Sequence, residues 1–328
     1  MNKEVIISVL LPIYNVREEW LRHAVDSILN QTFKDFELIC ILDAPTDDSE
    51  RIIREYADKD SRIVILKNES NHGIVYSLNR GLSSARGKYI ARMDADDYSY
   101  PGRFEKQLKY LIENDCDILA TRHNNIDTKD TIVYVCPVIE DSTIPSTLKY
   151  KNFMAHPTWM VKKNVYEQLG GYRGIYLCED YDFLLRAAYG TPAFRLGICD
   201  EILLDYRFQD PLNQENSEKQ HFIQTLTTCL LQSNYKNLST IDPEEIRNRV
   251  DKTAGCLSAP KFSKNIKRYR RYKQLVYAGR YKYAFIYALL CPKPIRIIAL
   301  FSIKNEKIYK LTSQISSLKR KATAHKAE

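Results

Sequence analysis

Three aspartates lie close together at Asp94, Asp96 and Asp97, directly after the apolar segment 88–93. Carboxylates so close repel one another unless a positive group joins them. In parallel α/β sheets the carboxyl ends of the strands line the ligand crevice. Mg²⁺ and Mn²⁺ are hard ions that take oxygen ligands there and bridge to phosphates. The pattern therefore favours a divalent metal site, the alternative being a solvated acidic turn that caps the next helix.

The residues before this cluster alternate between strand and helix patterns. Apolar runs predict strands over 6–12, 36–42, 62–66 and 88–93, and an amphipathic helix follows each of them. Asp47 and Glu50 have the spacing of a capping box at the start of the second helix. This β-α-β-α order predicts an α/β fold with a mostly parallel sheet flanked by helices.

The remainder of the chain is less regular. Residues 117–138 are rich in strand-forming residues, and helices are expected over 162–169 and 180–189. Residues 194–207 predict two short strands that break near Asp200 and Glu201. From residue 214 onward the pattern is helical.

Composition separates a basic tail from an acidic body. Residues 260–328 contain 18 Lys and Arg but two acids, whereas the net charge of the whole chain is +8. Isoleucine, leucine and phenylalanine interleave with these cations, which favours an anionic membrane surface as the partner over nucleic acid. A solvated helical face is the third possibility. No two of the eight cysteines form a Cys-x-x-Cys pair, and their spacing fits neither a zinc knuckle nor a disulfide framework.

The order and spacing of short motifs resemble family 2 of the inverting glycosyltransferases, which have the GT-A fold. The matching segments are 8–15 (Ser-Val-Leu-Leu-Pro-Ile-Tyr-Asn), 28–32, the loop at 43, 71–73, 78–79, 87–92, 94–97, 101–104, 170–173 and 179–183. Together they cover roughly residues 5–207. One departure is Ala44, since family members often have a second Asp at that position.

The resemblance implies a donor site on the first strands. Pro12 and Tyr14 would lie at the end of the first strand, with Tyr14 near the nucleotide base. Asp43 would bond the base or ribose, Asn79 falls in a matching segment on the nucleotide side, and Arg207 would reach the diphosphate. Tyr14 as a core aromatic, Asp43 as a turn former and Arg207 as an exposed surface residue remain open.

The resemblance also implies a metal-dependent reaction. Asp94 and Asp96 would form the Asp-x-Asp element that holds Mn²⁺ or Mg²⁺ together with the donor's ribose and diphosphate. Asp97 could replace either as a metal ligand.

A catalytic base is expected on the later helix. Asp180, paired with Glu179 at its start, would take the proton from the acceptor hydroxyl, because a neutral alcohol is a poor nucleophile. Both acids could instead only cap the helix, where negative charge is favoured. His156 could shape the acceptor side, although a lone histidine is more often structural.

The sequence thus predicts a GT-A domain over 1–212, with a nucleotide-sugar-binding half (1–120) and an acceptor-side half (121–212). A helical and basic region would follow over 213–328, with a membrane surface as its expected partner. The expected enzyme transfers a sugar from a nucleotide-sugar, most readily a UDP-sugar, to a glycan or lipid-linked acceptor in capsule, lipopolysaccharide or exopolysaccharide synthesis. The protein is expected in the cytoplasm, at the inner face of the cell membrane. A nucleotidyltransferase and a non-catalytic sugar- or membrane-binding protein are the alternatives.

Overall fold

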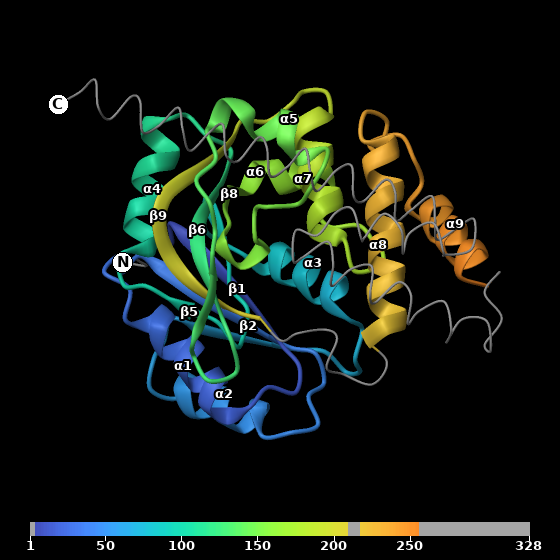
Figure 1. Ribbon diagram of the computed structural model, residues 1–328. Coiled ribbons are helices and arrows are strands. Elements are labelled where there is room, and N and C mark those ends of the chain that lie inside the picture. Colours follow the sequence, from blue (N-terminus) through green and yellow to red (C-terminus); the bar gives the residue numbers. More distant parts are fainter. Residues whose placement is uncertain (1–3, 209–216, 256–328) are drawn as a thin grey trace. The chain divides into compact units, whose positions relative to one another are not determined.

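The computed structural model describes residues 4–208 and 217–255, which form two compact units (Figure 1). The first unit contains 4–144, 153–172 and 192–208, and the second contains 145–152, 173–191 and 217–255. The units therefore interleave along the chain, and the predicted acceptor-side half contributes to both. The predicted helical region is described over 217–255, and the basic segment 260–328 lies outside the described residues.

The first unit is built on one mixed sheet. Its described strands follow the order β3-β2-β1-β4-β8-β6-β9-β5, and β7 pairs with β6 outside this path. Their bounds are β1 Ile7–Ile13, β2 Phe36–Leu42, β3 Ile63–Lys67, β4 Tyr89–Arg92, β5 Tyr98–Ser99, β6 Ile118–Ile126, β7 Ile132–Val135, β8 Met160–Lys162 and β9 Leu196–Arg207. The first four strands are parallel, as predicted. β8 runs antiparallel to both β4 and β6, while β6 and β9 are parallel.

Helices cover both faces of the parallel strands. They are α1 Glu18–Leu29, α2 Ser49–Ala57, α3 Ile74–Ser84, α4 Arg103–Glu113 and α6 Lys163–Leu169, with short 3₁₀ turns at Asp141–Thr143 and His156–Thr158; α5 Ile144–Leu148 crosses between the units. The odd-numbered side chains of β1 join α1, α2 and α4 in one apolar core. On the opposite face α3 approaches closely at Gly81, where a Cβ would lie 3.1 Å from Leu10 and Ile41. Figure 1 shows α1 and α2 together on one side of β1 and β2, and α3 on the other.

The second unit is helical where it is described. It contains α7 Glu179–Tyr189, α8 Ser217–Asn234 and α9 Pro243–Gly255. A buried ion-pair cluster holds it together, because Asp182 is fully buried and accepts from both Arg173 and Arg186. Arg173 also donates to the carbonyl oxygens of Leu238 and Ile241, at 3.0 Å each. None of the helices in the described ranges has the length and hydropathy to cross a bilayer.

Two local predictions were wrong. Residues 196–207 form one continuous strand, not two, because Asp200 and Glu201 are accommodated in a bulge: the pairing with β6 jumps from Cys199 to Ile202. A bulge lets polar residues turn outward without ending the strand. The predicted capping box is also absent, since Glu50 pairs with Arg54 and Lys67 and does not turn back to the helix start.

A buried polar cluster fixes the spacing of β1, β2 and β4. The Ser8 hydroxyl donates to Glu37 Oε1 at 2.6 Å and accepts from the Gly87 N–H at 2.8 Å. The Arg86 guanidinium donates to Glu37 Oε2 at 2.7 Å. A Cβ at Gly87 would lie 2.5 Å from the backbone nitrogen of Ser8, so only glycine lets β4 start here.

We therefore expect Gly87→Ala to lower the free energy of unfolding by about 1–3 kcal/mol, because the added methyl group has no space against backbone. Urea unfolding of the purified protein measures this change. Gly102→Ala is the matched control, since a Cβ there would meet only the end of the flexible Lys106 side chain at 3.4 Å. Equal unfolding midpoints for the two variants would contradict the prediction.

Candidate functional site

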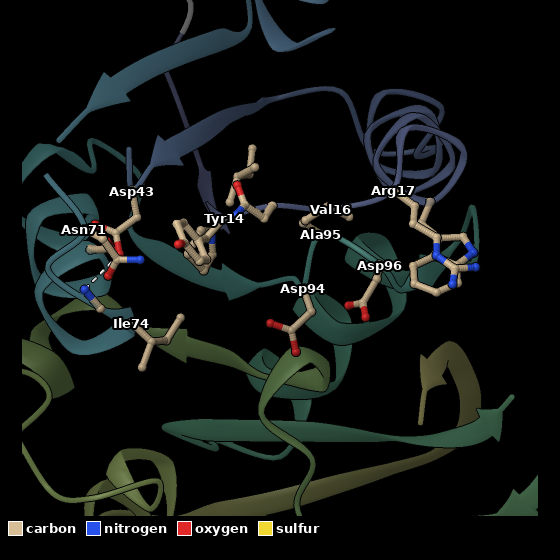
Figure 2. Close-up of a pocket in the computed structure, with 15 residues that line it drawn as sticks. Tyr14, Val16, Arg17, Asp43, Asn71, Ile74, Asp94, Ala95 and Asp96 are labelled. Atoms are coloured by element: carbon tan, nitrogen blue, oxygen red, sulfur yellow. Dashed lines mark hydrogen bonds between the residues drawn. The ribbon is translucent and has the colours of Figure 1, made fainter. Parts of the chain in front are cut away.

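A pocket of about 560 Å³ lies at the carboxyl ends of β1, β2 and β4 (Figure 2). It is lined by Pro12, Ile13, Tyr14, Asn15, Val16, Arg17, Trp20, Asp43, Asn71, Gly73, Ile74, Ser77, Asp94, Ala95 and Asp96. Parallel strands end at the same edge of a sheet, so loops distant in sequence meet there. The pocket brings together five of the residues predicted from the sequence: Pro12, Tyr14, Asp43, Asp94 and Asp96.

The backbone turns sharply where β1 and β2 end in this pocket. Asn15 and Ala44 have positive φ angles of 45° and 52°. Asn15 secures the turn because its Oδ1 accepts from the Thr46 N–H at 2.8 Å. Ala44 has no side-chain oxygen to support the left-handed conformation, which aspartate and asparagine adopt more readily than alanine.

Asp43 organises the loop that forms one end of the pocket. Its Oδ1 accepts from Asn68 Nδ2 at 2.7 Å and from the His72 N–H at 2.9 Å, and its Oδ2 accepts from the Gly73 N–H at 2.8 Å. A carboxylate offers about four acceptor positions. Asp43 therefore shapes the pocket wall and keeps acceptor capacity at Oδ2. Its contact with a base or ribose stays a prediction.

The three clustered aspartates have different surroundings. Asp94 and Asp96 line the pocket, and Asp94 Oδ1 accepts from Arg92 Nη2 at 2.6 Å. Asp97 is 1% exposed. Its Oδ1 accepts from the Arg207 N–H at 2.8 Å, and its Oδ2 has no hydrogen-bond partner within the described residues.

Burial of these acids shifts their protonation. Burial, followed by the charge of Asp94, raises the pKa of Asp96 to about 6. Burial, followed by the charges of Asp94 and Asp96, raises the pKa of Asp97 well above its usual range. Burial, together with repulsion between neighbouring carboxylates, therefore disfavours the charged forms of Asp96 and Asp97.

Carboxylates whose charged form is disfavoured by burial are stabilised by a hard divalent cation, and two of the three clustered aspartates line the pocket. In the part of the chain that the structure describes, no group of three or more His, Cys, Asp or Glu side chains converges as a protein-only metal cage. Mg²⁺ and similar ions are commonly held by one or two carboxylates, with phosphate and water completing the shell. Asp94 and Asp96 match that arrangement, whereas Asp97 does not line the pocket. The role of Asp97 as a metal ligand stays a prediction.

Arg207 lies buried beside the aspartate loop and does not line the pocket. Its Nε donates to the Asp96 carbonyl oxygen at 2.9 Å, its Nη1 donates to the Asp127 carbonyl oxygen at 2.9 Å, and its Nη2 pairs with Asp130 at 2.7 Å. The guanidinium also stacks on Trp20, 4.6 Å from the ring centroid. These contacts hold the aspartate loop in position, and the contact of Arg207 with a diphosphate stays a prediction.

Asn79 and His156 also lie outside this pocket. Asn79 clamps the backbone of Tyr172: its Nδ2 donates to the carbonyl oxygen at 2.8 Å and its Oδ1 accepts from the N–H at 2.9 Å. His156 Nε2 lies 2.7 Å from the Tyr172 hydroxyl, which lies 3.0 Å from the Tyr166 hydroxyl. Burial lowers the pKa of His156 well below its usual range, so its ring is neutral.

Glu179 and Asp180 belong to the second unit, at the start of α7. Asp180 is half-buried; its Oδ2 accepts from Asn152 Nδ2 at 2.8 Å and its Oδ1 from the Tyr181 N–H at 2.6 Å. The nearby Asp182 is committed to the buried arginine cluster. Asp180 therefore keeps solvent access that Asp182 lacks, as a base would need, and its catalytic role stays a prediction.

Sequence reasoning did not single out Arg17, Trp20, Asn71 or Ser77 as site residues. Asn71 lies in one of the matched segments, and Ser77 follows one helical turn after Gly73. Arg17 and Trp20 come directly after the end of the first strand. Their position shortly after Tyr14 could have indicated a place in the site. An arginine followed by two glutamates, however, is typical of an ordinary exposed helix start.

We expect Asn79→Ala to lower the thermal unfolding midpoint while leaving nucleotide affinity unchanged within about twofold, because the lost contacts are two backbone hydrogen bonds worth roughly 1 kcal/mol each. Differential scanning fluorimetry and titration with nucleoside diphosphates measure the two quantities. Ser83→Ala, on the same helix, is the control with one local bond to Asn79 O. A large loss of nucleotide affinity at an unchanged midpoint would show that Asn79 contacts the ligand.

Comparisons with known proteins show what the sequence is similar to. The family model described as "Glycosyl transferase family 2" matches residues 8–170. An uncharacterized glycosyltransferase of Methanocaldococcus jannaschii is 36% identical over 237 residues, 71% of this chain and 80% of its own length. The O-antigen biosynthesis glycosyltransferase WbnJ of Escherichia coli is 33% identical over 213 residues, 65% of this chain and 83% of its own length.

Solved structures share the fold at low sequence identity. S. aureus TarS 1–349 in complex with UDP-GlcNAc has a TM-score of 0.58 at 16% identity, covering 97% of this chain and 92% of that one. The mannosyltransferase PcManGT from Pyrobaculum calidifontis, in complex with GDP-Man and Mn²⁺, has a TM-score of 0.54 at 14% identity, covering 95% and 86%. The family match and these relatives show that the chain belongs to glycosyl transferase family 2 and is a glycosyltransferase, and its GT-A-like fold agrees with this.

Proposed function

We propose that this glycosyltransferase is an inverting, divalent-metal-dependent enzyme that transfers a sugar from a UDP-sugar to the hydroxyl of a glycan or lipid-linked acceptor. The proposal rests on one observation: Tyr14, Asp43, Asp94 and Asp96 line the same pocket at the ends of three parallel strands. An aromatic ring and an acid at one end suit a nucleoside, and two carboxylates further along suit a metal-bound diphosphate.

Relatives and structural neighbours support the substrate class. WbnJ is described as an enzyme of O-antigen biosynthesis, TarS binds UDP-GlcNAc, and PcManGT binds GDP-Man with Mn²⁺. We infer the same general chemistry here, with surface polysaccharide synthesis as the setting. Because both UDP- and GDP-sugars occur among the neighbours, a donor screen decides the nucleotide.

Asp94 and Asp96 would hold the divalent ion, Mn²⁺ or Mg²⁺, and Asp97 would keep their loop in place from its buried position. A bound ion offsets the negative charge that develops on the departing nucleoside diphosphate. Asp180 would accept the proton of the attacking hydroxyl, while Glu179 supports the helix start beside it. One displacement with one base inverts the configuration at the anomeric carbon.

The proposal places the enzyme in the cytoplasm at the inner face of the membrane. Its basic segment 260–328 would contact anionic lipids, each Lys or Arg adding about 1 kcal/mol near such a surface. A lipid-linked acceptor would then be within reach. No helix that could span a bilayer is needed for this arrangement.

We expect Asp180→Asn to slow nucleoside diphosphate release from the donor by roughly 10²–10⁴-fold, because the base that activates the acceptor is lost. Donor affinity, measured by calorimetry with Mn²⁺, should stay within about twofold of the parent, since only proton removal changes. Glu179→Gln is the matched control for removing a charge from the same helical turn. Release at the parent rate by Asp180→Asn would disprove the base assignment, and product with retained configuration by NMR would disprove inversion.

A second prediction concerns pH and the metal. The pKa of Asp96 is raised to about 6 from an ordinary value of 3.8. Ionisation of Asp96 therefore destabilises the metal-free fold progressively as pH rises from about 4 to about 6, and this cost is complete above that range. Because metal ligands must be deprotonated, we expect Mn²⁺ to raise the thermal midpoint much more at about pH 7.5 than at about pH 5.

Asp96→Asn should abolish most of this pH-dependent gain, as followed by fluorimetry with and without Mn²⁺. Asp58→Asn, an acid at the end of α2 outside the pocket, should keep the parent response. A Mn²⁺ shift that is the same at both pH values in the parent would contradict the assignment of Asp96 as a ligand.

A further inference from the structure

The pocket is short of positive charge for the ligand that the proposed function assigns to it. Its lining includes the carboxylates of Asp43, Asp94 and Asp96 but a single basic side chain, Arg17. Arg92 pairs with Asp94 but does not line the pocket, and a divalent ion held by Asp94 and Asp96 would offset only part of the diphosphate's charge. The departing nucleoside diphosphate gains further negative charge as the sugar leaves. A second positive group next to the diphosphate is therefore favoured by the electrostatics of the pocket.

Arg17 stands directly before α1 and is held by stacking. Its Cζ lies 4.4 Å from the centroid of the Trp20 ring. Trp20 is 8% exposed and also contacts the buried guanidinium of Arg207, which donates to the Asp96 carbonyl oxygen. This series of contacts connects Arg17 to the aspartate loop. In Figure 2 Arg17 lies at the end of the pocket beyond Asp96, opposite Asp43 and Asn71.

A guanidinium over an aromatic face is attracted to the ring without using its N–H donors in hydrogen bonds, so these donors remain available to a ligand. Within residues 4–208 and 217–255, the Arg17 side chain makes no hydrogen bond or ion pair. The adjacent Glu18 pairs with Arg22 at 2.8 Å and with Arg51 at 3.7 Å. Arg17 is thus an exposed cation that lies over Trp20, and the acid next to it in sequence is already paired.

We propose that Arg17 binds the diphosphate of the nucleotide-sugar donor and of the departing nucleoside diphosphate. This inference rests on the proposed function and extends it by naming a donor-binding cation on α1. The planar fork of arginine matches phosphate oxygens, and hydrogen bonds between charged groups are about twice as strong as neutral ones. Trp20 is a positioning residue that keeps the fork in place.

The test is calorimetric titration of the full chain with Mn²⁺, using UDP and GDP as diphosphate probes and uridine and guanosine as nucleosides without phosphate. For the diphosphate that the parent binds, we expect Arg17→Ala to weaken affinity roughly ten- to hundredfold. Affinity for the matching nucleoside should stay within about twofold, since the base and ribose contacts are untouched. Arg17→Lys should recover part of the loss, because it restores charge without the stacked fork.

Arg54→Ala is the matched control, because Arg54 is an exposed arginine on α2 outside the pocket and pairs with Glu50. It should bind like the parent. Parent-like diphosphate affinity in Arg17→Ala would overturn the inference and leave the proposed function standing. Equal loss of nucleoside and diphosphate affinity would overturn it too, since that result indicates a structural role. A parent that binds neither diphosphate with Mn²⁺ would overturn both proposals.

Discussion

Burial of like charges at the end of β4 is the constraint on which the site depends. Three acids follow one strand, and the desolvation that raises the pKa of Asp96 and Asp97 makes the loop costly without compensating cations. The fold supplies them from separate elements. Arg92 on β4 pairs with Asp94, and the fully buried Arg103 on α4 donates to the Arg92 carbonyl oxygen at 2.8 Å. These contacts fix the loop's geometry but leave negative charge at the pocket, where a cation can bind.

Arg207 shows how late parts of the sequence complete a site that begins in the first third. Its backbone N–H reaches Asp97 across 110 positions, and its side chain holds the Asp96 carbonyl and the loop between β6 and β7. β9 can place Arg207 beside the aspartate loop because the strand is continuous and Asp200 and Glu201 lie in a bulge. The continuity of the strand is therefore part of how the aspartate loop is positioned.

The parallel half of the fold was predictable because apolar runs buried on both faces leave few alternatives to strands in an α/β sheet. The loops at Tyr14, Asp43 and Asp94 follow those strands, so their meeting at one edge could be predicted as well. The contacts that Asn79 and Arg207 make within the fold could not be predicted, because their partners are a backbone segment and a loop far away in sequence. Hydrogen-bonding capacity is visible in a sequence, but the choice of partner is made by tertiary structure.

Residues of the same type differ in burial, and this difference separates the charges that stabilise the fold from those that we propose contact a substrate. Asp182 is fully buried between two guanidinium groups, whereas Asp180, two positions earlier, keeps access to solvent. Trp20 contacts the buried guanidinium of Arg207, each nitrogen of which has a partner, and the exposed guanidinium of Arg17. A buried, satisfied charge has no capacity left for a ligand, while an oriented and exposed one gains most from binding an opposite charge. In this fold, therefore, we expect the substrate to bind at the acids and cations whose hydrogen-bonding capacity is only partly used.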